Sequence, residues 1–307
     1  MNIIEYENYQ EQRQVRADDF PYLTYPCSIP YDFTEVPLHW HDEMEFIYIK
    51  KGSGIVSVDH RDLLAHAGDL IFICPGQLHA IRQWQQEAME YENIIFEPRL
   101  LGSPQTDPSY ELYLAPILSR QAELPLRLTP ETDHYAAIAG CIDQIDEIRR
   151  TFPSGYELFI KGKLCELFFC FYQFGMISSP AAVSISDQRA LEKARQILKF
   201  IEQHYSEPLS IQKMAEASGF SQSHFMKFFR QTFGTSFTGY LNAYRLTMAS
   251  RLLLASEDTI LTVAADTGFE NLSYFNRMFK RRFGVTPSQF RRRESAVQPS
   301  GSRHAAT

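Results

Sequence analysis

The sequence predicts an α+β protein of two domains, with a β-rich N-terminal domain and an all-helical C-terminal domain. Short β-branched and aromatic runs, separated by turns, occupy residues 37–96. Apolar residues at three- and four-residue intervals dominate from residue 187 onward. At 307 residues the chain is long enough for two hydrophobic cores. We expect 1–175 to form the first domain, 176–186 a linker, 187–293 the second domain and 294–307 a disordered tail.

Charge is distributed unevenly along the chain. The formal net charge is −7, but residues 187–293 hold 16 Lys and Arg against 9 Asp and Glu, which leaves −14 on the remainder. A basic C-terminal third on an acidic body is the electrostatic pattern of a nucleic-acid-binding domain. The five cysteines lack paired spacing, and no apolar run is long enough for a bilayer. We therefore expect a cytoplasmic protein with reduced thiols and no membrane partner, with Cys165 and Cys170 in the core.

The N-terminal domain is predicted to be a small barrel or sandwich followed by helices. Turn sequences at 51–54, 59–62, 67–69 and 75–76 separate the predicted strands at intervals of about ten residues. Residues 91–96 add a further strand, whereas 1–30 show no clear period. Helical spacing then predicts helices over 110–118, 133–150 and 155–175.

Three residues near the start of the β-rich region share parity. On one extended strand, His39, His41 and Glu45 would project to the same face. His79 follows the Pro75-Gly76 turn and would reach them from a neighbouring strand. Over residues 37–96 this pattern resembles the cupin fold, and the resemblance implies that the two histidines, the carboxylate and the third histidine meet inside a barrel.

Two kinds of site fit this group of residues. Three imidazoles and a carboxylate suit a divalent metal, namely Zn, Ni, Fe or Mn. Alternatively, the four side chains line a pocket for a small organic effector and hold no metal. In either case Trp40, which follows His39, offers a stacking surface for the effector or takes a structural position at the rim.

The C-terminal domain contains an internal repeat. The segment MAEASGFSQSHFMKFFRQTFGTS, starting at Met214, corresponds to VAADTGFENLSYFNRMFKRRFGVTP, starting at Val263. Gly219-Phe220 aligns with Gly268-Phe269, and Phe229 aligns with Phe279. The offset is 49 residues before the turn and 50 after it, so the second turn has one extra residue. Residues 188–205 and 237–255 are predicted as helices that precede the first copy and connect the two copies.

The doubled unit resembles the DNA-binding domain of the AraC/XylS transcription regulators. The resemblance covers residues 187–293 and implies two helix-turn-helix units that present their second helices to the DNA major groove. One face of each such helix is apolar and the other polar and cationic, as base and phosphate contacts require. Leu272 departs from the often polar residue at its position. The DNA-binding candidates are Ser223, Met226, Lys227, Arg230, Leu272, Ser273, Asn276, Arg277, Lys280 and Arg281.

These resemblances imply a transcription regulator whose N-terminal domain senses a small molecule, such as a sugar or another small metabolite. Its partners would be promoter DNA, the effector, a second copy of the chain and, for an activator, RNA polymerase. The apolar stripe Ile138, Ile142 and Ile145 predicts that helices within about 133–175 form the dimer interface, or alternatively that these helices cover the barrel. We expect no enzymatic activity. Two alternatives remain, a metal-dependent cupin enzyme fused to a DNA-binding domain and a ligand-independent regulator with an inert barrel.

Overall fold

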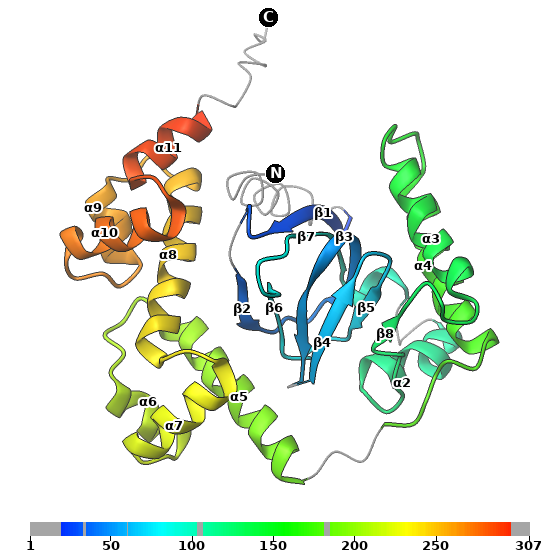
Figure 1. The fold of residues 1–307 in the computed structure, drawn as a ribbon, viewed down its shortest axis with the longest axis horizontal. Coiled ribbons are helices and arrows are strands. Elements are labelled where there is room, and N and C mark those ends of the chain that lie inside the picture. The colour runs from blue at the N-terminus through cyan, green and yellow to red at the C-terminus, as the bar shows by residue number, and fades with distance from the viewer. Residues whose placement is uncertain (1–19, 33–34, 60, 103–106, 181–184, 296–307) are drawn as a thin grey trace, which may run out of the picture. The chain divides into compact units, whose positions relative to one another are not determined.

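The computed structural model describes residues 20–32, 35–59, 61–102, 107–180 and 185–295. These residues divide into two compact units, with the boundary in the chain between Leu191 and Glu192. The first unit is a β-sheet with helices and the second is all helical (Figure 1), so the predicted α+β class is confirmed. Within the described ranges, we find no helix that combines the length and the hydropathy needed to cross a bilayer.

The first unit contains an eight-stranded antiparallel sheet. Strand β3 is its centre, because the first half of this 15-residue strand pairs with β5 and β7 and the second half with β4 and β6. Strand β1 pairs with β7, β2 with β6 and β8 with β5. The strands are β1 (Tyr22–Ile29), β2 (Glu35–His39), β3 (Met44–Val58), β4 (Arg61–His66), β5 (Leu70–Ile73), β6 (His79–Gln83), β7 (Met89–Phe96) and β8 (Arg127–Leu128).

Strand β3 changes partners at an irregularity near Gly52. The β3–β7 register shifts between Ile49 and Lys51, and Gly52 has φ of +70°. A Cβ atom at Gly52 would lie 1.9 Å from the carbonyl oxygen of Ala88. Glycine is therefore required here, both by the backbone angle and by the close approach of the neighbouring chain.

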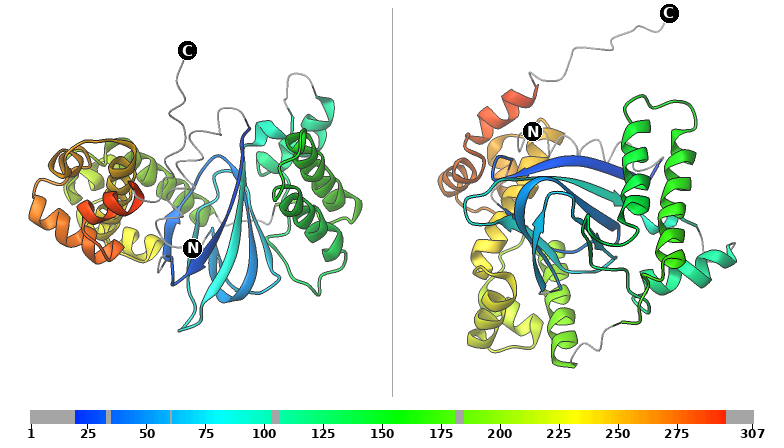
Figure 2. Two further views of the ribbon diagram at one scale, coloured as in Figure 1. Left: turned by 90° about the horizontal axis from the view of Figure 1, so that it is seen from above. Right: turned by 45° about the vertical axis from the view of Figure 1, so that its right-hand side comes forward.

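Helices cover one face of this sheet (Figure 2). They are the 3₁₀-helix η1 (Pro98–Leu100), the π-helix η2 (Tyr110–Leu114), α2 (Ala115–Leu118), α3 (Tyr135–Ile148) and α4 (Tyr156–Gln173). One hydrophobic core joins them to the sheet: Phe46 and Phe72 of the strands share it with Ile138 of α3 and Phe171 of α4. The rings of Phe72 and Phe171 meet edge to face with centroids 5.1 Å apart.

The predicted dimer stripe lies in this core. Ile138, Ile142 and Ile145 are each at most 1% exposed and pack within the first unit. These three residues therefore cover the sheet and cannot themselves contact a second copy, whereas a dimer through other residues of 133–175 stays a prediction. Helical spacing identified a buried face, but spacing alone does not say whether a sheet or another chain buries it.

The two cysteines expected in the core differ. Cys170 is buried, whereas Cys165 is exposed, because it lies on the outer face of α4.

The second unit consists of seven helices among the described residues. They are α5 (Ile185–His204), α6 (Ile211–Ser218), α7 (Gln222–Phe233), α8 (Phe237–Ala255), α9 (Ile260–Asp266), α10 (Leu272–Phe283) and α11 (Pro287–Ser295). Helix α5 starts inside the segment expected to be a linker, and 181–184 of that segment lie outside the described residues. Residues 294 and 295 end α11, and the remainder of the expected tail also lies outside the described part of the chain.

Each copy of the repeat forms two helices and a turn. Ser221 caps α7 by accepting from the backbone N–H of His224, and Asn271 caps α10 by accepting from that of Tyr274. Gly219 is the C-cap of α6 and has the left-handed conformation, whereas the C-cap of α9 is Thr267, before Gly268. Glu270 lies between Phe269 and the cap residue Asn271, whereas Phe220 is followed directly by the cap residue Ser221. The second turn thus has one residue more than the first, as the change in offset predicts.

Helix α8 connects the two copies and contributes to the core of each. At its start, Phe237 contacts Phe225 and Phe229 with ring centroids 5.5 and 5.6 Å apart. Toward its end, Leu246, Ala249 and Leu253 pack in the core that contains Phe275 and Phe279. The helix is continuous over its 19 residues, so the two helix-turn-helix units share one rigid support.

Candidate effector site and DNA-reading helices

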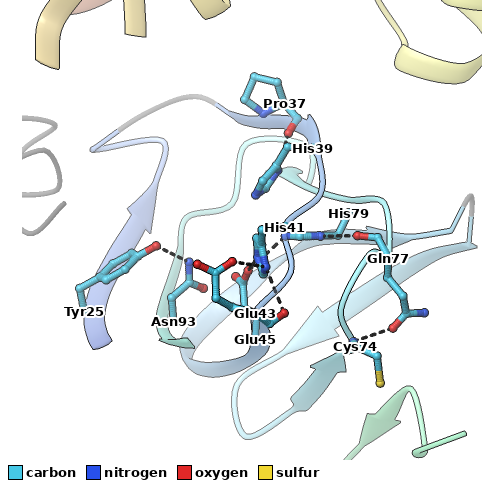
Figure 3. Close-up of polar contacts among 10 residues, drawn as sticks. All are labelled: Tyr25, Pro37, His39, His41, Glu43, Glu45, Cys74, Gln77, His79 and Asn93. Carbon is cyan, nitrogen blue, oxygen red and sulfur yellow. Dashed lines mark hydrogen bonds and ion pairs between the residues drawn. The ribbon is translucent and has the colours of Figure 1, made fainter. Parts of the chain in front are cut away.

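Four side chains converge at one place in the first unit (Figure 3). One potential ligand atom from each of His39, His41, Glu45 and His79 lies within 4.8 Å of the others. His39 ends β2 and pairs in register with His79, the first residue of β6. Glu45 comes from β3, and His41 from the loop between β2 and β3.

The expected convergence is present, but the strand argument for it is wrong. The strand ends at His39 and resumes at Met44, so His39, His41 and Glu45 do not share a strand face. Instead the chain turns between β2 and β3, and the turn brings His41 back over Glu45. The three residue numbers differ by two and four, but this shared parity has no structural meaning across a loop.

The carboxylate of Glu45 is the hub of the cluster. Its Oε2 atom lies 2.7 Å from Nε2 of His41 and 3.1 Å from Nε2 of His79. The rings of His39 and His79 have centroids 4.1 Å apart. Glu45 is 2% exposed and His79 is fully buried. The carboxylate and one imidazole are thus held away from water, while His39 and His41 are partly exposed.

The remaining ring nitrogen of each histidine is oriented by a backbone carbonyl. Nδ1 of His39 donates to Pro37, 2.9 Å away, and Nδ1 of His79 donates to Gln77, also 2.9 Å away. Nδ1 of His41 donates to the carbonyl of Glu43 at 3.1 Å. Because a carbonyl oxygen only accepts, each Nδ1 carries its proton, and Nε2 is the nitrogen available for coordination. Such outer contacts fix the tautomer and ring orientation in metal-binding histidines.

The titration behaviour of the site follows from its burial and crowding. Burial, and after it the charges of the neighbouring His79 and His41, lower the pKa of His39 to about 3. For Glu45, burial alone would raise the pKa. The charge of His79 and the hydrogen bonds from His41 and His79 outweigh burial and hold that pKa well below its usual range. Glu45 is therefore the permanent anion of the cluster.

Two polar residues that the sequence did not single out lie beside the cluster (Figure 3). Asn93 of β7 pairs in register with Tyr25 of β1, and its Nδ2 donates to the Tyr25 hydroxyl at 3.2 Å. Asn93 is 5% exposed, and its Oδ1 has no hydrogen-bond partner among the described residues. Asn93 sits in the strand NIIF at the parity of Tyr91 and Ile95, which is the only sequence signal that it faces the same side.

Trp40 lies in the loop after β2 with a partly exposed side chain. Its role as a stacking surface therefore stays a prediction.

The polar faces of α7 and α10 are exposed, as the spacing predicts. In α7, Phe225 and Phe229 are fully buried, while Met226 is 47% exposed. In α10, Phe275 and Phe279 are fully buried. The candidates exposed on the opposite faces are Ser223, Met226, Lys227 and Arg230 in α7 and Ser273, Arg277, Lys280 and Arg281 in α10.

Two candidates in α10 are less accessible. Leu272 packs against the core of the second helix-turn-helix unit, so it serves first as an apolar anchor for the start of α10. Asn276 is half-buried. A residue absent from the candidates, Tyr274, is 36% exposed, and its hydroxyl accepts from Asn242 of α8 at 2.9 Å. The guanidinium of Arg277 lies 5.5 Å from the centroid of the Tyr274 ring, which positions the cation at the surface of the helix.

Comparison with known proteins assigns both units. A family described as "AraC-like ligand binding domain" matches residues 29–154, and one described as "Helix-turn-helix domain" matches residues 214–293. The chain belongs to the AraC family of transcription regulators. This AraC-family regulator has a ligand-binding N-terminal domain and a DNA-binding helix-turn-helix C-terminal domain.

Several known proteins are similar to this chain over different lengths. The regulator is 24% identical over 296 residues to the uncharacterized HTH-type transcriptional regulator YdeC of Bacillus subtilis, covering 96% of this chain and 99% of YdeC. It is 34% identical over 106 residues to an uncharacterized HTH-type transcriptional regulator of Staphylococcus aureus, covering 34% of this chain and 14% of that protein. Among solved structures, fatty-acid-bound ToxT of Vibrio cholerae is 16% identical with a TM-score of 0.45, covering 88% and 95% of the two chains.

Proposed function

We propose that His39, His41, Glu45 and His79 form the sensing site of this regulator and hold a divalent metal ion. The single observation that supports this most strongly is the arrangement of the imidazoles. All three Nδ1 atoms donate to backbone carbonyls, while His41 and His79 turn Nε2 toward one carboxylate oxygen. A cation among these atoms satisfies nitrogen lone pairs and a carboxylate together.

The donor set fits the metal ions named from the sequence. Imidazole suits Zn, Ni and Fe, and the carboxylate also suits Mn. The anionic Glu45 is buried, and a buried charge is retained only when it is paired or bound to a metal. With four protein donors, a bound ion supplies a Lewis-acidic centre for an oxygen or nitrogen donor of a small effector. We place the effector, a sugar or another small polar metabolite, beside this centre and within reach of Trp40.

The first test is the metal content of protein purified without an affinity tag or chelator. We expect about one divalent ion per chain, reduced at least tenfold in His41→Ala and His79→Ala. His66, exposed on β4, provides the matched control, because His66→Ala removes an imidazole from the same sheet and should keep the metal. Wild-type protein that is metal-free after growth and dialysis with each of the four metals would refute the metal site.

The second test separates sensing from the two alternative functions. A thermal-shift screen against sugars and small organic acids should raise the melting temperature of wild type but not of His41→Ala. DNA affinity measured without effector should be equal in both proteins. Turnover of a small molecule by iron-loaded protein would support the enzyme alternative. A wild type that no compound shifts, while it binds promoter DNA constitutively, would support the inert barrel.

For the C-terminal domain, we propose that α7 and α10 read promoter DNA. Ser223, Met226 and Lys227 would face base edges from α7, and Ser273, Asn276 and Arg277 from α10. Arg230, Lys280 and Arg281 would contact phosphates. Their exposure opposite the buried phenylalanines supports this division.

We further propose that the regulator acts in the cytoplasm as a homodimer and, if it activates transcription, contacts RNA polymerase. Its relatives are bacterial regulators, and bacterial promoter DNA lies in that compartment. Effector binding would change the dimer arrangement or free the DNA-binding domains. Light scattering with and without promoter DNA tests the dimer.

A further inference from the structure

The loop between β5 and β6, residues 74–78, contacts two members of the His/Glu cluster. The carbonyl oxygen of Gln77 accepts from Nδ1 of His79 at 2.9 Å. The backbone N–H of Gly76 donates to the carbonyl oxygen of His41, also at 2.9 Å. A change in the position of either histidine therefore acts on the backbone of this loop.

The side chain of Asp59, just after β3, holds the same loop from the other end. Its Oδ1 accepts from the backbone N–H of Leu78 at 3.2 Å, and its Oδ2 accepts from Nε2 of Gln77 at 3.0 Å. The backbone N–H of Asp59 also donates to the carbonyl oxygen of Leu78 at 2.8 Å. Gln77 closes the loop, because its Oε1 accepts from the N–H of Cys74 at 2.8 Å (Figure 3). The loop is thus fastened to the end of β3.

An ion pair connects Asp59 to Arg120, which follows α2. Nη2 of Arg120 donates to Oδ2 of Asp59 at 2.7 Å. The side chain of Asp59 is 11% exposed and that of Arg120 is 32% exposed. A charge-assisted hydrogen bond that is partly shielded from water in this way is stronger than one at an open surface. One carboxylate oxygen therefore receives a donor from loop 74–78 and a donor from Arg120.

The segment that carries Arg120 is paired with the chain that leaves the first unit. Glu123 and Ser178 form an antiparallel bridge. The N–H of Glu123 donates to the carbonyl oxygen of Ser178 at 2.8 Å, and the N–H of Ser178 donates back at 3.0 Å. Residues 121 and 122 separate Arg120 from this bridge. After Ser178 the chain leads to α5, which begins at Ile185 and continues into the second unit.

We propose that Asp59 and Arg120 are positioning residues that transmit occupancy of the His/Glu cluster to Ser178, at the end of the first unit. This rests on the proposed metal site and specifies how that site affects DNA binding. Neither residue is a member of the cluster. They act through loop 74–78 on one side and through the Glu123–Ser178 bridge on the other.

A bound cation restrains the loop. It replaces the direct contacts of Glu45 with His41 and His79, so each of these imidazoles is held through Nε2 by the ion and through Nδ1 by a backbone carbonyl. Local opening of loop 74–78 then becomes less frequent, and the ion pair extends this restraint to the bridge. The chain that leads to α5 is held at its start. Occupancy of the cluster and affinity for DNA are thereby coupled.

Hydrogen exchange of the full-length protein, with Zn²⁺ as the probe, measures the transmission directly. In wild type, Zn²⁺ should slow the exchange of the Leu78, Glu123 and Ser178 N–H groups by roughly threefold or more, because all three donate within this network. In Arg120→Gln, which removes the cation, the slowing should persist at Leu78 and disappear at the two amides of the bridge. Slowing at all three amides in this variant would overturn the role of the ion pair.

The consequence for DNA is measured with an operator selected from random DNA. Zn²⁺ should change the Kd of the wild type by roughly fivefold or more relative to metal-free protein, and that of Arg120→Gln by less than about twofold. Arg120→Lys keeps a cation and should recover most of the response. Arg82→Gln breaks an exposed ion pair with Asp62 on the strand that begins at His79. This matched control should respond like the wild type.

Metal content, measured on the same samples, separates this coupling from the metal site. A wild type that takes up Zn²⁺ at the cluster, so that His79→Ala loses it, but whose DNA affinity does not change would overturn the coupling and leave the metal site standing. Arg120→Gln with wild-type Zn²⁺ content and a wild-type response would do the same. A variant that loses Zn²⁺ together with the response would show that the ion pair only maintains the site, which also overturns transmission. A wild type that takes up none of the four metals would overturn both proposals.

Discussion

Three charged residues link the sheet to α3 and make the first unit sensitive to pH. Lys50 of β3 lies 3.0 Å from Glu92 of β7 and 3.3 Å from Asp146 of α3. Oδ1 of Asp146 is buried with no hydrogen-bond partner among the described residues. Burial, and then the negative charge of Glu92, raise the pKa of Asp146 to about 7. One lysine thus serves two carboxylates, and a proton on Asp146 relieves the excess negative charge.

The prediction is that Asp146→Asn stabilises the protein at high pH but not at low pH. The folded state retains a proton that the unfolded chain releases, so stability falls as pH rises from about 4 to about 7. The full shift corresponds to about 4 kcal/mol. Because Asp146 is partly exposed to solvent and the pKa of Glu92 is lowered at the same time, we expect the free energy of unfolding to change by only about 1–2 kcal/mol. Asparagine keeps the shape of the protonated acid and removes the penalty.

Thermal unfolding followed by circular dichroism at about pH 4 and pH 8.5 measures the effect. For a unit of this size the gain at high pH corresponds to an increase of roughly 2–8 °C in melting temperature. At low pH the variant and the wild type should melt together. Asp143→Asn, at an exposed position of the same helix, controls for loss of charge on α3. An equal difference between Asp146→Asn and wild type at both pH values would refute the shared-proton argument.

Three further predictions concern the DNA-binding unit. Phe279→Ala should lower the free energy of unfolding by about 3–5 kcal/mol in denaturant titrations, because the ring is fully buried; a loss below about 1 kcal/mol would contradict that packing. Arg277→Ala should cost roughly 1–3 kcal/mol at an operator selected from random DNA but little at unrelated DNA, whereas Lys280→Ala should weaken all DNA alike and reduce the salt dependence of binding. Gly284→Ala should cost about 1 kcal/mol by the same titration, since φ is +74° with free space around the added methyl; no loss would show that the helix end relaxes.

The second unit was the more predictable from sequence because its determinants are local. The spacing of Phe275 and Phe279, the glycine turns and the cap residues each specify a short segment, and the repeat shows each twice. The helix that sequence reasoning missed, α11, also has a local signal. Thr286, just before Pro287, and Gln289 in the first turn form a capping box, with Thr286 N–H donating to Gln289 Oε1 at 3.0 Å.

The first unit was less predictable because its contacts are between distant segments. Strand β1 was missed, since its sequence YLTYPCSI lacks clear alternation and contains a proline, and only pairing with β7 makes it a strand. The His/Glu cluster was identified by residue type, although the loop that assembles it was not. The spacing of Ile138, Ile142 and Ile145 predicts a buried face of α3, and only the tertiary contacts show that the sheet covers it.

Helix α8 imposes a fixed phase between the two DNA-reading helices. The start of α8 packs in one aromatic core and its end in the other. Neither helix-turn-helix unit can therefore turn about the axis of α8 independently. One residue added to the middle of α8 would rotate the second helix-turn-helix unit by about 100° relative to the first and move it by about 1.5 Å. Helix α8 is rigid and packed at both ends, so it cannot bend or stretch to compensate for this rotation. Helix α8 therefore fixes the distance between the two operator segments that α7 and α10 contact. Operators of this regulator can differ in base sequence far more readily than in the spacing between these segments.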